Sequence, residues 1–273
     1  KRMMMWGDII LTHPDRIKDI PTDTIMLTWG YEVRPSFDSQ IAPFARSGFE
    51  FFVCPGVSNW SRILPDFDNA ARNIYGFVRD GSRFGALGVL NTAWEDDGES
   101  LNTTSWHGYT WGAECAWNAS ATALEDFNRR LGAVLFGEKE DHFGQAIELL
   151  GRTHRLPGMN GMNNGRFWQL DFGPVQPADR ESAEQLLAIV RPAIGHLEAC
   201  RKQATVNADL LDGFLHGARR MELIGQRVID RLTAIAEYEQ AGKAESGQAE
   251  AHVRKAEQLI RGTRDAFESL GKR

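Results

Sequence analysis

The first hundred residues contain four short apolar runs, and each run leads into a turn that carries a tryptophan. The segments are MMMWGD at 3–8, LTWGYE at 27–32, VCPGVSNW at 53–60 and GVLNTAWEDDGE at 88–99. Continuous apolar runs that alternate with helix-like sequence are typical of parallel strands buried on both faces. Parallel strands need long crossover connections, usually helical, so this pattern constrains the fold strongly. The N-terminal part is therefore predicted to be an α/β domain.

Turn and cap signals divide this part into four strand–helix units. The expected strands cover 3–6, 24–29, 49–54 and 85–90, and the expected helices cover 14–19, 38–47, 67–79 and 109–117. Four units in the first 117 residues match the spacing of a (β/α)₈ barrel, in which eight units take about 250 residues. The predicted fold class is therefore α/β, with half of a (β/α)₈ barrel followed by helices. A small open sheet that is complete with four strands is the alternative.

The rest of the chain has the periodicity of packed helices. Apolar residues recur at every third or fourth position over 207–240 and 249–270, which predicts amphipathic helices. Further helices are expected at 122–136, where Thr122 and Glu125 fit a capping box, and at 141–150 and 177–203. No strict heptad persists, so the pattern favours a helical bundle over a long coiled coil. The predicted domains are 1–120, α/β, and 121–273, α-helical.

Composition excludes several classes of protein. The net charge is −6 without a long basic run, so nucleic acid is not an expected partner. No apolar stretch approaches the length of a membrane span, so a membrane partner is not expected either. The three cysteines, Cys54, Cys115 and Cys200, form no disulfide framework or zinc-ligand spacing and fit a reducing, cytoplasmic location. No phosphate loop, dinucleotide fingerprint or metal-ligand motif occurs, so no cofactor or metal is expected.

The tryptophan-bearing turns are the candidate site, because ligands of parallel α/β folds bind at the carboxyl ends of the strands. An aromatic ring can cover the apolar face of a pyranose, and carboxylates can accept hydrogen bonds from its hydroxyls. The sequence therefore predicts a sugar-binding cleft. Trp106, Trp111 and Trp117 are expected to pack on the last helix of this part, and Asp97 and Glu99 to be turn residues. The candidate binding residues are Trp6, Asp8, Trp29, Tyr31, Trp60, Trp94 and Asp96.

On these motifs the chain resembles the β-N-acetylhexosaminidases of glycoside hydrolase family 20, and most of all the bacterial subgroup with a helical C-terminal domain. The resemblance runs from MMMWGD at residue 3 to GAECAW, which ends at residue 117. It implies strands five to eight of a (β/α)₈ barrel. It also implies a retaining, substrate-assisted hydrolysis of terminal N-acetylglucosamine or N-acetylgalactosamine.

The resemblance further implies roles for single residues. Trp6, Trp29 and Trp94 match the aromatic walls of the sugar site, and Asp96 matches the carboxylate that holds sugar hydroxyls. Trp60 stands where many members place a tyrosine.

The family's catalytic Asp-Glu pair is expected upstream of Lys1, and no adjacent Asp-Glu occurs here. The resemblance therefore implies no catalytic residue in this chain and no activity of the chain alone. The expected partners are an N-acetylhexosaminide substrate and either the missing N-terminal half of the barrel or a second copy of the chain. The alternatives are a non-catalytic sugar-binding module and a helical interaction module.

Overall fold

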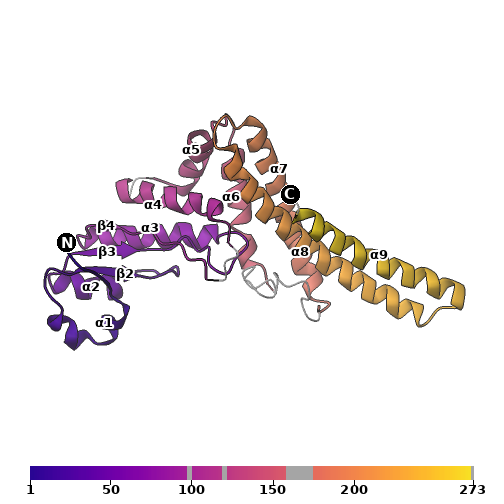
Figure 1. Ribbon diagram of the computed structural model, residues 1–273, viewed down its shortest axis with the longest axis horizontal. Coiled ribbons are helices and arrows are strands. Elements are labelled where there is room, and N and C mark those ends of the chain that lie inside the picture. The colour runs from indigo at the N-terminus through magenta and orange to yellow at the C-terminus, as the bar shows by residue number, and fades with distance from the viewer. Residues whose placement is uncertain (97–99, 119–121, 158–174, 272–273) are drawn as a thin grey trace. The chain divides into compact units, whose positions relative to one another are not determined.

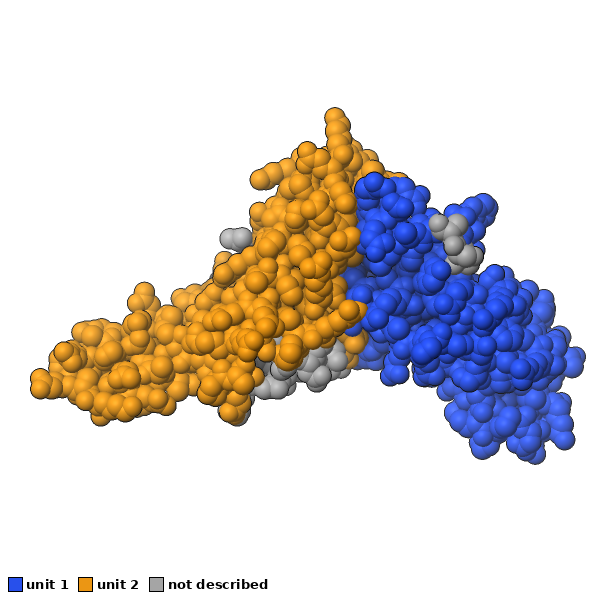
Figure 2. Space-filling view, turned by 180° about the vertical axis from the view of Figure 1, so that it is seen from behind, with its two compact units in different colours: residues 1–60, 65–130 blue, residues 61–64, 131–273 orange. Residues whose placement is uncertain are grey.

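A computed structural model describes residues 1–96, 100–118, 122–157 and 175–271 of the chain (Figure 1). It contains two compact units, which Figure 2 colours separately. Unit 1 is Lys1–Trp60 with Pro65–Arg130, and unit 2 is Ser61–Leu64 with Leu131–Arg273. The division falls inside helix α5 (Leu124–Phe136). The predicted domain boundary at 120 lies on residues 119–121, which are outside the described part.

Unit 1 contains one sheet of four parallel strands in the order β1-β2-β3-β4. Each strand lies next to the strand that follows it in the sequence. Because crossovers between parallel strands are right-handed, the connecting helices then lie on the same face of the sheet. Helices α2 and α3 pack against the sheet (Figure 1). The strands are β1 (Met4–Trp6), β2 (Ile25–Trp29), β3 (Phe51–Cys54) and β4 (Gly88–Val89). The helical segments are α1 (Asp8–Thr12), η1 (Pro14–Asp19), α2 (Asp38–Arg46), α3 (Phe67–Arg83), η2 (Asn102–Ser105), α4 (Trp106–Asn118) and the first part of α5.

The prediction of half a (β/α)₈ barrel is wrong. The described residues form one four-stranded sheet, and helices make up most of the described chain. The spacing of roughly 30 residues per strand–helix–strand unit is common to open parallel sheets and barrels, so spacing alone cannot distinguish them. The positions of all four predicted strands are confirmed to within a few residues, and the observed topology is that of the open four-stranded alternative.

The face of the sheet under α2 and α3 is the core of unit 1. Met26, Phe51 and Val53 point to this face and are at most 2% exposed. A Cβ on Gly81 of α3 would lie 2.6 Å from Val53 Cγ1, so only glycine lets α3 approach β3 this closely. Burying each large apolar side chain contributes about 1.5–3 kcal/mol to folding.

The opposite face of the sheet is apolar and partly exposed. Register places Trp6, Leu27 and Phe52 in one row on this face. Trp6 is 39% exposed and Met4, two residues earlier on the same face, is 48% exposed. Unit 1 therefore presents apolar surface on the side away from α2 and α3.

A buried carboxylate ties the start of α2 to α3. Asp80 is fully buried, and its side chain accepts hydrogen bonds from the Phe37 backbone N–H and from Arg79 Nε, both at 2.9 Å. Burial alone would raise the pKa of Asp80, but the hydrogen bonds from Arg79 and Phe37 outweigh it, and the pKa is lowered. The fold therefore stabilises the ionised form of Asp80.

Unit 2 is helical. It contains the end of α5, followed by α6 (His142–Leu150), η3 (Thr153–Arg155), α7 (Asp179–Gln203), α8 (Ala208–Ala241) and α9 (Ser246–Leu270). Helices α8 and α9 run side by side as a long hairpin (Figure 1), and Phe143 packs edge-to-face on Phe136 and Phe214 in the core. The helices predicted over 141–150, 177–203, 207–240 and 249–270 are confirmed. No helix within the described ranges is long and apolar enough to cross a membrane.

Candidate functional site

Five aromatic side chains from the strand-end turns of unit 1 meet at the carboxyl edge of the sheet. Trp29 stacks on Tyr31 with ring centroids 4.9 Å apart, and Tyr31 lies 5.0 Å from Trp60. Trp94 lies 6.5 Å from Tyr31 and 6.4 Å from Trp6. These centroid distances are those of interacting aromatic rings. We call this group, Trp6, Trp29, Tyr31, Trp60 and Trp94, the aromatic patch.

The aromatic patch is only partly buried. Trp6 and Trp94 are 39% and 40% exposed, and the three other rings are half-buried. Core tryptophans are largely covered, whereas a contiguous exposed apolar patch on a folded protein usually marks a binding surface. The structure thus brings together all five aromatic residues that the sequence proposed, with ring surface left accessible.

Tyr31 is at the centre of the patch. Its hydroxyl accepts a 2.8 Å hydrogen bond from Trp94 Nε1. Burial raises the pKa of Tyr31 and outweighs the opposing effect of hydrogen bonds with Thr92 and Trp94, while the negative charge of Asp8 raises it further. The phenol is therefore neutral at physiological pH.

Two asparagines on α3 hold the turns that carry the patch. Asn69 Nδ2 donates to the Tyr31 carbonyl at 2.7 Å, and Asn73 Nδ2 donates to the Gly30 carbonyl at 2.9 Å. The side-chain oxygen of Asn73 accepts from the Gly56 backbone N–H at 3.1 Å. Asn69 and Asn73 are one helical turn apart, so both side chains face the same loops. Neither residue was among the predicted site residues; the available signal in the sequence is two amides at i and i+4 on the helix that follows the third strand.

A third asparagine fixes the turn after β4. Asn59 is fully buried, and its side-chain oxygen accepts from the Trp94 backbone N–H at 3.1 Å. Its Nδ2 group donates to Ser100 Oγ at 3.0 Å. Trp94 is therefore positioned through its backbone as well as through its indole.

The close approach of two rings depends on a glycine. A Cβ on Gly56 would lie 2.9 Å from Tyr31 Cδ1 and 3.1 Å from Trp60 Cζ3. Both distances are shorter than ordinary van der Waals contacts between carbon atoms. Gly56 is thus required for the observed packing of Tyr31 and Trp60.

The predicted carboxylates are less well placed than the rings. Asp96 is exposed in the turn after Trp94, and it has no hydrogen bond or ion pair with any residue that the structure describes. Asp8 begins α1 and is half-buried. Asp97 and Glu99, together with Trp168, lie outside the described residues.

The tryptophans expected to pack on the last helix divide into two groups. Trp111 is buried and donates its indole N–H to the Ala71 carbonyl at 2.9 Å, as expected of a core residue. The expectation is wrong for Trp117, which is 88% exposed, and Trp106 is 43% exposed. Trp111 lies on a different side of α4 from Trp106 and Trp117, so only Trp111 points into the core, whereas the prediction assigned all three to the packed side.

Other chemistry-bearing residues of unit 1 are structural. His107 is buried and hydrogen-bonded to Asn128 Oδ1 at 2.8 Å, and burial lowers its pKa to about 4. Burial raises the pKa of Cys54 to about 12, so its thiol is not a nucleophile at neutral pH. In the described part of the chain, no group of three or more His, Cys, Asp or Glu side chains could hold a metal ion.

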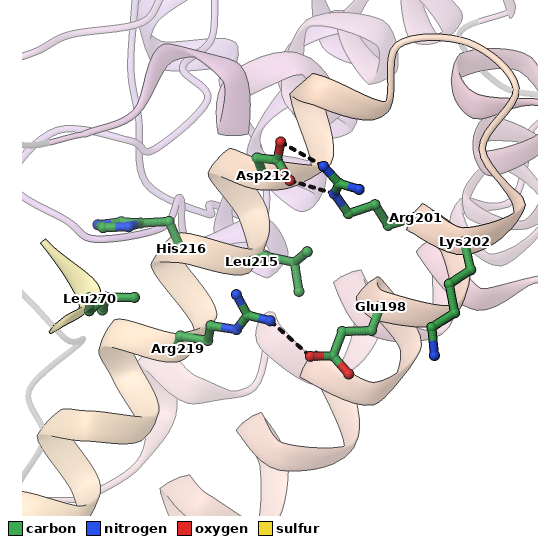
Figure 3. Close-up of a pocket in the computed structure, with 8 residues that line it drawn as sticks. All are labelled: Glu198, Arg201, Lys202, Asp212, Leu215, His216, Arg219 and Leu270. Atoms are coloured by element: carbon green, nitrogen blue, oxygen red, sulfur yellow. Dashed lines mark hydrogen bonds and ion pairs between the residues drawn. The ribbon is translucent and has the colours of Figure 1, made fainter. Parts of the chain in front are cut away.

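Unit 2 contains a polar cavity of about 670 Å³ between α7, α8 and the end of α9 (Figure 3). Arg201 makes two hydrogen bonds to Asp212, at 2.5 and 3.1 Å, and Arg219 pairs with Glu198 at 2.9 Å. These two ion pairs leave the walls polar with little excess charge. The lining residues are Glu198, Arg201, Lys202, Asp212, Leu215, His216, Arg219 and Leu270.

Comparison with known proteins gives a fold likeness and no family. The sequence matches no protein-family model, and no curated protein is significantly similar. Among solved structures, the chain is similar to a GH138 enzyme targeting pectin rhamnogalacturonan II, with a TM-score of 0.51 and 13% sequence identity. The match covers 99% of this chain and 48% of that one, so this chain spans about half the length of the enzyme it matches. At this identity the likeness concerns the fold.

The resemblance to glycoside hydrolase family 20 is contradicted by this comparison. The structural neighbour belongs to a different glycoside hydrolase family, and nothing in the comparisons points to family 20. The motifs that carried the resemblance are short, and each joins a strand to a tryptophan and a polar residue. Unrelated parallel α/β folds can place that combination at their strand ends, so it cannot identify one family.

Proposed function

We propose that unit 1 binds a pyranose sugar on the aromatic patch, within a carbohydrate-active protein of the glycoside hydrolase type. The observation that carries the proposal is the convergence of five partly exposed rings at the carboxyl edge of a parallel sheet. The fold likeness to a glycoside hydrolase supports the enzyme class rather than a purely structural role.

The patch has the two chemistries that sugar recognition needs. Trp6 and Trp94 are in contact with each other and are both partly exposed, so together they offer a continuous ring surface for the C–H groups of a pyranose. The Tyr31 hydroxyl contacts Trp94 and is a polar group that can bond to a sugar hydroxyl.

The net charge of the chain favours a neutral sugar. The chain carries a net charge of −6, so an anionic uronate would meet overall repulsion. We therefore rank neutral hexopyranoses above uronates as ligands of the patch.

Calorimetric titration of the full chain tests the proposal. The panel contains N-acetylglucosamine, N-acetylgalactosamine, galactose, rhamnose, galacturonate and the rhamnogalacturonan II that the structural neighbour targets. We expect Trp94→Ala to weaken binding of the best ligand by about 1–3 kcal/mol, or roughly 5- to 150-fold, because it removes a ring wall and the hydrogen bond to Tyr31.

Trp117→Ala is the matched control, since Trp117 is an exposed tryptophan of the same unit on α4 and lies outside the patch. Its affinity should equal that of the parent chain. Equal affinity in both variants, or absence of binding across the panel, would refute the site. Release of chromophore from aryl glycosides by the same samples then tests whether the chain alone hydrolyses what it binds.

A further inference from the structure

Unit 2 has an apolar groove along the far part of the α8–α9 hairpin. The groove has a volume of about 580 Å³. Ala234 and Ala256 form its floor and are less than a tenth exposed, whereas Ile235, Tyr238 and Ile260 are 43%, 69% and 49% exposed. Four charged residues complete the lining: Arg231, Glu239, Glu257 and Arg261.

Most of the groove lies on the part of the hairpin that α7 does not cover. Arg180, in the first turn of α7, donates from Nη2 to Thr233 Oγ1 at 3.1 Å. Beyond Thr233, among the described elements, the two helices of the hairpin pack on each other (Figure 1). A pair of helices covers only part of each amphipathic stripe, and the uncovered part is the groove.

The four charges of the groove lack partners within the described part of the chain. None of them makes a hydrogen bond or an ion pair with another described residue. Glu257 and Arg261 stand one turn apart on α9 and still do not pair. Other charges of the hairpin do pair across it, as Glu237 does with Lys255 and His252 at 2.6 Å. Charges without a described partner thus gather at the edges of the exposed apolar surface.

The positive and negative charges of the groove lie at different ends of it. Asp230 bonds to Thr263 at 2.8 Å, which sets Arg231 of α8 level with Arg261 of α9. Glu239 lies eight residues further toward the tip, or about 12 Å, and Glu257 about 6 Å from Arg261 in the same direction. The groove is therefore positive at the end near α7 and negative toward the tip.

We infer that this groove is the interface for a second copy of the chain, which docks with its hairpin reversed end for end. A twofold axis across the groove places each copy's Arg231 and Arg261 beside the other copy's Glu239 and Glu257. An interface of this kind must be self-complementary, and equal numbers of sorted cations and anions around an apolar strip meet that requirement. Ile235, Tyr238 and Ile260 of both copies then bury one another, as in a four-helix bundle.

Charge reversal tests this arrangement in the full chain. Sedimentation equilibrium over a wide concentration range should show a reversible dimer. One variant carries Arg231→Glu with Arg261→Glu, and the other carries Glu239→Lys with Glu257→Lys. Each should dimerise at least about 100-fold more weakly, because like charges then face each other across the twofold axis. An equimolar mixture of the two variants should recover the dimer, since opposite charges are restored.

Two further variants separate docking from folding. Arg129→Glu reverses an exposed charge in unit 1, outside the groove, and should leave the dimer unchanged. Tyr238→Ser removes a 69% exposed ring and should weaken the dimer while the helical circular dichroism stays that of the parent chain. A parent chain that stays monomeric at every concentration would overturn the inference. So would a parent dimer that neither reversed variant weakens, or a mixture that fails to recover association.

Discussion

Unit 1 and unit 2 both expose apolar surface, but they expose different kinds. The exposed apolar residues of the unit 1 patch are flat rings beside the phenol of Tyr31. Those of the unit 2 groove are mainly branched aliphatic side chains between charges of both signs. Rings with hydroxyl-binding neighbours suit a sugar, whereas aliphatic strips with sorted charges suit another helix. The chemistry around an apolar patch thus tells more about its partner than its area does.

The two units also differ in how their polar groups are held. In unit 1, Asn59 and Asn73 are fully buried, and each bonds to the backbone of a loop that carries the patch. In unit 2, the ion pairs of Arg201 and Arg219 are about half exposed to solvent. Buried hydrogen bonds fix geometry because an unmade one is costly, whereas exposed ion pairs contribute little. A site that must position rings is therefore expected in unit 1.

The largest expected effect concerns the buried carboxylate of unit 1. Asp80→Ala should lower the free energy of unfolding by about 1.5–3 kcal/mol, because it leaves the Phe37 N–H buried without an acceptor and removes the bond to Arg79. Urea unfolding measures it. Asp126→Ala, which removes an exposed ion pair with Arg129 in the same unit, is the control and should cost less than about 1 kcal/mol.

The same residue predicts a pH dependence. The pKa of Asp80 is lowered in the fold, so the folded chain binds fewer protons than the unfolded chain in the range just below the ordinary value of about 4. Stability from this group is present above that value and is lost as the pH falls through the lowered pKa. The parent chain should therefore lose more stability on acidification than Asp80→Ala does, and parallel pH profiles of the two would contradict the role given to Asp80.

A smaller effect is expected where packing positions the rings without contacting the ligand. Gly56→Ala should displace Tyr31 and Trp60 and weaken sugar binding by about 1 kcal/mol, or roughly fivefold, while every aromatic residue stays in the chain. Gly195→Ala on α7 is the matched control, because its Cβ would meet no atom within 4 Å. Unchanged affinity of Gly56→Ala would show that the spacing of these two rings does not matter for binding.

The smallest effect belongs to the exposed pair of unit 2. A double-mutant cycle of Arg201→Ala and Asp212→Ala should give a coupling energy much smaller than the effect of Asp80→Ala and further reduced by salt, despite the two-point contact between the side chains. Thermal unfolding of the four chains measures it. A coupling energy as large as the effect of Asp80→Ala would show that the exposed ion pair of unit 2 stabilises the chain as much as the buried hydrogen bonds of unit 1 do.

Much of the local structure could be predicted from the sequence. Apolar runs ending in Trp6 and Trp29 became strands β1 and β2, and the three- and four-residue stripes of 207–240 and 249–270 became α8 and α9. These signals are local, since they depend on periodicity and on turn residues. The convergence of the aromatic residues followed from the parallel order of the strands.

What could not be predicted depends on contacts between distant residues. The Thr122 hydroxyl, expected to cap a helix, donates instead to Glu114 Oε1 at 2.5 Å, and α5 begins at Leu124. The link from Asn73 to the loops at Gly30 and Gly56 joins residues 43 and 17 positions apart. Unit spacing could not tell an open sheet from part of a barrel, and short strand-end motifs could not tell one sugar-binding family from another.

The tryptophan indole resonances give the most direct test of the central claim, that the aromatic patch is where this chain binds sugar. The chain has eight tryptophans, and each contributes one indole N–H signal in a nitrogen-edited NMR spectrum of a labelled sample. Titration with the best sugar should shift the signals of Trp6, Trp29, Trp60 and Trp94 with one common affinity, and leave those of Trp111 and Trp117 unmoved. Shifts at Trp117 or Trp106 without shifts at Trp6 and Trp94 would contradict the account.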